Sequence, residues 1–198
     1  MARAVQKRTL ETRARLIAAA EEVIAEAGYE AMRVEEVVQR AGVAKGTFFA
    51  HFRDKEALLE RLIGTRGDAQ LDRIEALPPP ADIPAIIAAL NPLIAEMTSE
   101  RYVFDLILRY SGAASRAETG PIAQTFARTD EVLSQWLALG PFRKDVTPAL
   151  LSSGVQAFLM HVTALHFCEL YHEQTLQEML TELLEAWLLP GGTGAKAG

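Results

Sequence analysis

Side chains that could bind a metal ion gather in one stretch near the C-terminus. His161, Cys168 and His172 have the spacing that places three residues on one face of a helix. Glu169 and His172 also form an ExxH pair, but a di-iron helical bundle needs two such pairs and two further glutamates. The sequence contains no GxSxG nucleophile motif and no glycine-rich phosphate loop. We therefore expect no metal, no cofactor and no catalysis, and a metal-dependent helical enzyme remains a remote alternative.

A second group of polar side chains lies in residues 44–51 and is suited to contact with nucleic acid. This segment reads AKGTFFAH, and a helix so short would be unstable unless it docked against others. Phe48 and Phe52 are spaced to hold its inner face. The side chains left facing outward are small, basic or hydrogen-bonding: Ala44, Lys45, Thr47 and His51. Such a face favours entry of the helix into a DNA major groove.

The elements that must position this helix are short and helical. An apolar stripe over residues 34–41 predicts a helix that ends at Gly42, and the next helix is expected to start near Ala44. The turn between them reads Ala41-Gly42-Val43, in which alanine permits close approach and glycine supplies an unusual backbone conformation. The pattern is that of a helix-turn-helix.

Charge is divided unevenly along the chain. The formal net charge is −6, which taken alone argues against a polyanionic partner. Residues 1–66 hold 12 Lys or Arg and 10 Asp or Glu, whereas residues 67–198 hold 8 and 16. Residues 38–55 carry Arg40, Lys45, Arg53 and Lys55 against Asp54 alone. This asymmetry favours a polyanion-facing N-terminal part and an acidic remainder.

Residues 9–63 resemble the TetR (tetracycline-repressor-like) family of transcriptional regulators. The segment AGVAKGTFFAHFRDKEAL is close to the family pattern AGVSKGTLYxYFxxKExL. The resemblance implies a first motif helix over 33–41 and a recognition helix over 44–50. It also implies DNA contacts by Arg33, Ala44, Lys45, Thr47, Phe49, His51 and Lys55.

Two residues depart from the family pattern. Arg33 stands where the family usually has threonine, so the expected capping hydroxyl is missing, although an arginine there could contact a phosphate. Phe49 replaces a frequent tyrosine and has no hydroxyl to donate to a phosphate. These departures leave the helix-turn-helix itself in place.

The whole chain is predicted to be all-α. Helix N-caps are expected at Thr9, Asp54 and Thr147, and three consecutive prolines at 78–80 mark the strongest break. Further helices are expected over 82–98, 100–111, 120–139, 147–171 and 173–189. We divide the chain into a DNA-binding domain (1–53), a helical ligand-binding and dimerisation domain (54–190) and a disordered tail (191–198).

The last two predicted helices carry wide apolar stripes. Burial within one subunit would explain them, and so would a four-helix seam between two chains, which the resemblance also implies. Mixed apolar and polar residues earlier in this domain suit a small-molecule pocket. The predicted ligand contacts are Met97, Phe104, Leu108, Phe126, Trp136, Phe158 and His161.

The sequence thus favours a homodimeric regulator, expected to be a repressor released from a palindromic operator by a small, mostly apolar effector. The main alternative is a helical module whose N-terminal part docks a protein. No run of eighteen uninterrupted apolar residues is present, so we expect no membrane span. The apolar stretch at residues 16–20 runs into Glu21 and Glu22 and is too short for a secretory signal, so we expect none. One cysteine suits a reducing compartment, and we expect a cytoplasmic protein.

Overall fold

The computed structural model describes residues 2–111, 120–168 and 174–190, with side chains from residue 6 onward. These residues form helices and contain no strand, which confirms the all-α prediction. The helices are α1 (Ala2–Ala27), α2 (Val34–Ala41), α3 (Lys45–His51), α4 (Lys55–Glu75), α5 (Ile83–Met97), α6 (Arg101–Tyr110), α7 (Pro121–Leu139), α8 (Pro148–His166) and α9 (Leu176–Leu188).

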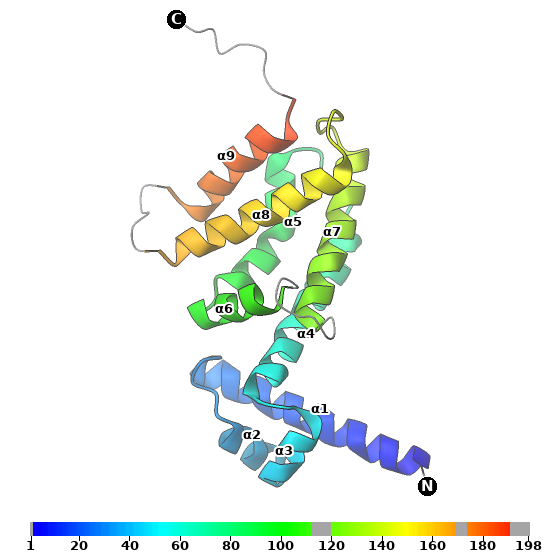
Figure 1. Cartoon of the computed structure of the whole chain (residues 1–198), viewed down its shortest axis with the longest axis vertical. Coiled ribbons are helices and arrows are strands. Elements are labelled where there is room, and N and C mark those ends of the chain that lie inside the picture. The colour runs from blue at the N-terminus through cyan, green and yellow to red at the C-terminus, as the bar shows by residue number, and fades with distance from the viewer. Residues whose placement is uncertain (1, 112–119, 169–173, 191–198) are drawn as a thin grey trace, which may run out of the picture.

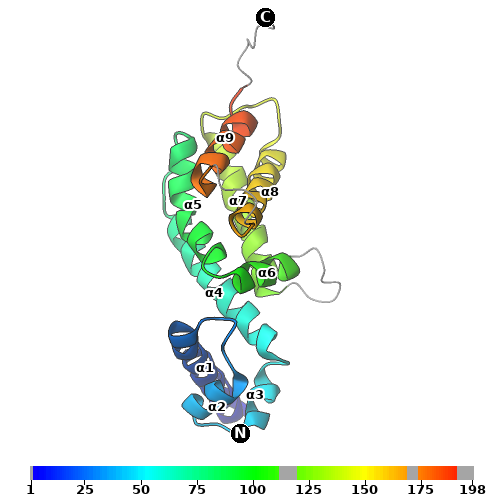
Figure 2. The same ribbon diagram turned by 90° about the vertical axis from the view of Figure 1, so that its left-hand side faces the viewer.

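The molecule is elongated, with a small head at one end and a larger body at the other (Figures 1 and 2). We call α1–α3 the head and α5–α9 the body. Helix α4 begins beside the head and runs into the body, where it packs mainly against α7. The predicted domain division falls at Asp54, the N-cap of α4. A rigid helix therefore connects the two parts.

Several predicted helix starts are confirmed. The side chains of Asp54 and Thr147 accept hydrogen bonds from the third residues of α4 and α8, and Asp82 does the same for α5. The helix after residue 173 begins later than expected, at Leu176, because Thr175 and Glu178 form a reciprocal capping box.

Other predicted boundaries are wrong or fall outside the described residues. Thr9 is not an N-cap, because α1 already begins at Ala2 and continues through it. The helix expected over 147–171 ends at His166. The tail at 191–198 lies outside the described part of the chain.

The head is packed around apolar side chains of all three of its helices. Leu16 and Ala20 of α1, Val37 of α2 and Phe48 of α3 are fully buried. Helix α3 spans only Lys45–His51, so burial of Phe48 supplies stability that a helix of this length lacks by itself.

Helices α4 and α7 approach each other closely at two glycines. A Cβ atom added to Gly64 would lie 2.5 Å from the Pro121 Cβ and 2.7 Å from its carbonyl carbon. A Cβ added to Gly67 would lie 2.7 Å from the Thr125 Cγ2. Larger side chains at either glycine would push the two helices apart.

Helix α8 is long and apolar enough to cross a membrane by length and composition alone, although polar residues interrupt it and it contains no run of eighteen apolar residues. Core helices of soluble proteins share this length and composition. In this structure α8 packs against α7 and α9, and only 33% of its apolar stretch is buried within the chain.

Candidate DNA interface and ligand cavity

The turn between α2 and α3 is fixed by backbone conformation and by α1. Gly42 adopts a left-handed conformation with φ of 62°, which a glycine enters without steric cost. The amide of Val43 then donates to the Val38 carbonyl at 3.0 Å, closing a Schellman-type cap. The guanidinium of Arg15 donates to the carbonyls of Ala41 and Gly42. These bonds set the angle at which α3 leaves the turn.

Aromatic residues anchor the inner face of α3. Phe48 is fully buried, and Phe52 is 4% exposed beneath the guanidinium of Arg13 at 5.3 Å. Phe49 is 50% exposed and contacts Phe48 edge to face. An aromatic ring half open to solvent on a short docked helix is available to a partner.

The structure places the predicted outward residues of α3 at different depths. Ala44 and Lys45 are exposed, whereas Thr47 and His51 are half-buried. Arg33 is also exposed and is the N-cap residue of α2, which has no side-chain cap, as its departure from the family pattern predicted. Ala44 likewise begins α3 without a side-chain cap.

Each of the four basic residues in 38–55 has an intramolecular partner, which the linear charge count did not reveal. The pairs are Arg40 with Glu26 and Glu22, Lys45 with Glu35, Arg53 with Asp54, and Lys55 with the Glu30 carbonyl. The hydrogen bond from Lys45 lowers the pKa of the Glu35 carboxyl. A DNA phosphate must therefore compete with Glu35 for the Lys45 ammonium.

Lys55 lies at the start of α4, where the head meets the body. Its ammonium donates to the Glu30 carbonyl at 2.6 Å and lies 5.2 Å from the centre of the Tyr102 ring of α6. Burial lowers the pKa of this ammonium. The predicted phosphate contact of Lys55 stays a prediction, and it would require the side chain to leave both partners.

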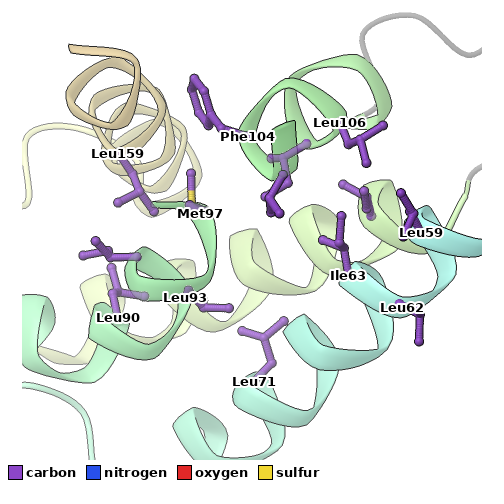
Figure 3. Close-up of a cluster of buried hydrophobic side chains, with 14 of the residues drawn as sticks. Leu59, Leu62, Ile63, Leu71, Leu90, Leu93, Met97, Phe104, Leu106 and Leu159 are labelled. Carbon is purple, nitrogen blue, oxygen red and sulfur yellow. The ribbon is translucent and has the colours of Figure 1, made fainter. Parts of the chain in front are cut away.

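A cavity of about 60 Å³ lies between α4, α5, α6, α7 and α8. Figure 3 shows apolar side chains of α4, α5, α6 and α8 gathered around this region, including Ile63, Leu93, Met97 and Leu159. Glycines and polar residues complete the wall. The full lining is Ile63, Gly64, Gly67, Leu93, Glu96, Met97, Ile107, Ile122, Thr125, Phe126, Thr129, Gln156 and Leu159.

Two of the seven predicted ligand residues, Met97 and Phe126, line this cavity. The other five do not lie on its wall because they face other parts of the body. Phe104 and Trp136 are buried in the core, while Leu108 and His161 are exposed. Phe158 lies against Trp187 of α9, with ring centres 6.0 Å apart.

Comparison with known proteins supports the interpretation of the head as a helix-turn-helix, and the similarity to one relative covers most of the chain. The profile of the family described as "Bacterial regulatory proteins, tetR family" matches residues 16–62. The HTH-type transcriptional regulator Mb2936c of Mycobacterium bovis is 31% identical over 156 residues, which cover 75% of this chain and 71% of that protein. The chain belongs to the TetR family of transcriptional regulators.

Other family members match over shorter stretches. The fatty acid metabolism regulator protein of Bacillus subtilis is 40% identical over 60 residues, or 30% of this chain. That match covers 31% of the relative's length, and the match to the regulator YvdT of the same organism covers 52%. The FadR repressor of Thermus thermophilus, solved with lauroyl-CoA, shares the fold at a TM-score of 0.62 and 16% identity, covering 94% of this chain and all of that one.

Within this family fold, the head is joined to the body by polar contacts that sequence reasoning missed. The hydroxyl of Tyr29, in the turn after α1, donates to Glu96 Oε1 of α5 at 2.6 Å. Arg66 of α4 donates to the same hydroxyl and lies 3.7 Å from Glu96. Glu100 accepts from the Tyr29 amide at 2.9 Å and also from the Glu30 amide. We call Tyr29, Glu30, Arg66, Glu96 and Glu100 the joint.

Glycine is required where the joint meets α1. Gly28 has a φ of 86°, and a Cβ there would lie 2.9 Å from Glu100 Oε1. Burial and the hydrogen bond with Glu96 raise the pKa of Tyr29. The sequence pattern marks Gly28 as a helix stop, but nothing local links it to carboxylates about seventy residues away.

Among the described residues, no group of three or more His, Cys, Asp or Glu side chains is placed to hold a metal ion. Cys168 is a half-buried free thiol. The ExxH stretch, Glu169 to His172, lies outside the described residues.

Proposed function

We propose that this family member acts as a homodimeric repressor that binds a palindromic operator and is released by a small, mostly apolar effector. The observation that carries the proposal is the docked helix α3. It presents Ala44, Lys45 and Phe49 to solvent at one end of the molecule while Phe48 holds it in place. In this account α3 enters the major groove, and Lys45, Thr47 and His51 meet bases or phosphates.

Dimerisation through α8 and α9 supplies the second recognition helix. One α3 reads too few base pairs for specific binding, whereas two related by a two-fold axis read an inverted repeat. Support comes from the apolar residues that remain half-buried on these two helices. They include Phe158, Leu165, Met179, Leu183 and Trp187. A second copy of the chain would cover them, as the wide stripes in the sequence suggested.

The effector is proposed to bind in the cavity that α4, α5, α6, α7 and α8 enclose. Its wall is mainly apolar, which favours a ligand with an apolar body. The structural relative from Thermus thermophilus, crystallised with lauroyl-CoA, and FadR of Bacillus subtilis, crystallised with stearoyl-CoA, carry ligands with long apolar chains. Release needs only a difference in ligand affinity between the two states, about 1–3 kcal/mol for a roughly 5–150-fold effect.

Selection from a random-sequence duplex pool, followed by fluorescence anisotropy at two salt concentrations, tests DNA binding. We expect saturable binding to an inverted repeat that weakens steeply with salt. Lys45→Ala should weaken binding and reduce the salt slope by about one for each phosphate that its ammonium would neutralise. Arg73→Ala is the matched control, because it removes an exposed charge from the far end of α4.

Failure to enrich any inverted repeat would contradict the proposal and favour the protein-docking alternative. An equal loss of affinity in Lys45→Ala and Arg73→Ala would remove Lys45 from the interface, since the effect would then reflect net charge alone.

A further inference from the structure

Glu96 is the one residue on the cavity wall that carries a formal charge. The other polar side chains there are neutral and have partners on α4 or α7. Thr125 donates to the Gly64 and Pro121 carbonyls, Thr129 to the Thr125 carbonyl, and Gln156 to the Asp130 carboxylate. Among the lining residues, Glu96 is therefore the strongest acceptor for a ligand.

The same carboxylate is a member of the joint. Its Oε1 accepts the Tyr29 hydroxyl at 2.6 Å and lies 3.7 Å from Arg66 Nη1. The Glu96 side chain is 25% exposed, so it faces the cavity and the head at once. A ligand group that binds the Glu96 carboxylate must compete with the Tyr29 hydroxyl of the head.

We infer that the cavity accepts an amphiphile with an apolar body and a protonated amine, and that the amine binds Glu96 in place of the Tyr29 hydroxyl. This inference rests on the proposed function and adds the chemical class of the effector to it. The Tyr29 phenol and an ammonium group both donate charge-assisted hydrogen bonds to the carboxylate, but only the ammonium also brings a full positive charge to it. The ligand thus removes one of the bonds that hold the head against α5.

The size of the cavity gives a second consequence of binding. A space of about 60 Å³ is far below the roughly 300–1,000 Å³ of sites that enclose a drug-sized ligand. The wall includes Gly64 and Gly67, where α4 and α7 are in close contact. An amphiphile can enter only by widening this contact, and α4 leads directly to the head. Widening the cavity and breaking the Tyr29–Glu96 bond therefore act on the same joint.

The wall disfavours an anionic head group. No Lys or Arg belongs to the lining, and the nearby guanidinium of Arg66 is already engaged with the Tyr29 hydroxyl and with Glu96, from which it lies 3.7 Å. A carboxylate or phosphate in the cavity would face Glu96 and meet like-charge repulsion. A fatty-acyl thioester, whose charged part would have to stay outside the wall, is the competing ligand class that the experiment must separate.

Three probes of equal chain length test the inference on the full-length protein: octylamine, octanol and octanoate. Binding is measured by isothermal titration calorimetry at pH 7, where the amine is protonated, and independently by release of the selected operator. We expect octylamine to bind at least about tenfold more tightly than either other probe, because only it gains an ion pair. Octanoyl-CoA is titrated alongside as the representative acyl thioester.

Variants of the joint test whether Glu96 causes the preference for the amine. Glu96→Gln keeps the shape but not the charge, and should reduce the amine preference to less than about threefold. Glu100→Gln is the matched control: its carboxylate holds the same turn but does not line the cavity, so the preference should survive. Tyr29→Phe removes the competing hydroxyl and should tighten octylamine binding a few-fold while weakening operator affinity without ligand.

Three results would overturn the inference. The first is that octanoate or octanoyl-CoA binds as tightly as octylamine, and the second is that no probe binds. The third is that Glu96→Gln and Glu100→Gln lose the preference for the amine equally. Each is distinguishable from failure of the proposed function, because calorimetry requires no DNA and operator binding requires no probe.

Discussion

The head and the body of this protein are organised in opposite ways. The head packs Phe48 among buried side chains of α1, α2 and α3 and exposes polar residues on α3. The body and α4 together enclose a cavity beside two glycines of α4, and one carboxylate lies on its wall. A part that reads DNA must be rigid, whereas a part that responds to a ligand must have room to rearrange. The contrast teaches that the two functions proposed for this chain would require different packing.

The sharpest way to separate the two regions is to remove the anchor of the head. Phe48→Ala should lower the stability of the head by about 3–5 kcal/mol, because it leaves a cavity in a fully buried site. Both tryptophans, Trp136 and Trp187, lie in the body, so tryptophan emission reports on the body alone. Thermal melts should show early loss of helix by circular dichroism with little change in the emission transition.

Phe49→Ala is the matched control, since this ring is 50% exposed and its removal creates no buried cavity. Its melting temperature should stay close to that of the unsubstituted protein. If Phe48→Ala shifted both transitions equally, head and body would unfold as one unit and the distinction between them would not hold.

A second comparison uses one glycine of the head and one glycine of α4 on the cavity wall. Gly64→Ala should destabilise the protein by about 1–3 kcal/mol, because the new Cβ meets the Pro121 backbone. Gly46→Ala should stabilise α3 by about 0.5–1 kcal/mol, because its Cβ enters open space and alanine favours helix. Urea titration measures both. A loss of stability in Gly64→Ala together with a gain in Gly46→Ala supports the contrast in packing. Equal losses of stability in the two variants would contradict it.

Gly64→Ala should also weaken operator binding without ligand, since it separates α4 from α7 as the proposed effector does. Unchanged operator affinity in a folded Gly64→Ala protein would show that this helix contact does not govern the head.

The DNA-facing surface of the head can be strengthened by restoring a hydroxyl. Phe49→Tyr should tighten operator binding by about 0.5–1.5 kcal/mol per hydrogen bond formed with a phosphate. The ring is already exposed, so the change should leave thermal stability as it is. Anisotropy at constant salt measures the gain, and a loss of affinity would place Phe49 against a base or sugar instead.

The smallest expected effect concerns the pairing of Lys45. Glu35→Gln removes the carboxylate that Lys45 contacts in the free protein, and so frees the ammonium for a phosphate. Exposed pairs are weak, so operator affinity should rise by no more than about fivefold. Glu36→Gln removes a neighbouring exposed charge that has no such bond to Lys45 and serves as the control. Equal gains in both variants would indicate general repulsion from DNA rather than competition for Lys45.

The head was predictable because its determinants are local. These determinants lie within twenty residues of one another, and each is typical of one local structure. They are the Ala41-Gly42-Val43 turn, the apolar stripe of α2 and the anchoring side chains of Phe48 and Phe52. Even so, the linear count of basic residues overestimated the free positive charge. Arg40 pairs with two carboxylates of α1, and Lys45 of α3 pairs with a carboxylate of α2.

The cavity was less predictable because it depends on contacts between distant helices. An apolar residue on an amphipathic helix can take any of several places. Phe104 is buried in the core, Phe126 lines the cavity and Phe158 lies against Trp187, despite their identical chemistry. The pairing of Tyr29 with Glu96 joins residues 67 positions apart. Spacing along one helix carries no information about such a contact.

The central claim is that two copies of this chain read one inverted repeat, and sedimentation of the complex tests it most directly. The selected full site and a half-site of the same length are each mixed with protein and analysed by analytical ultracentrifugation. We predict two chains on the full site and an affinity for the half-site at least about a hundredfold lower, because the second α3 then has no specific contacts. One chain per duplex, or equal affinity for both duplexes, would contradict the account.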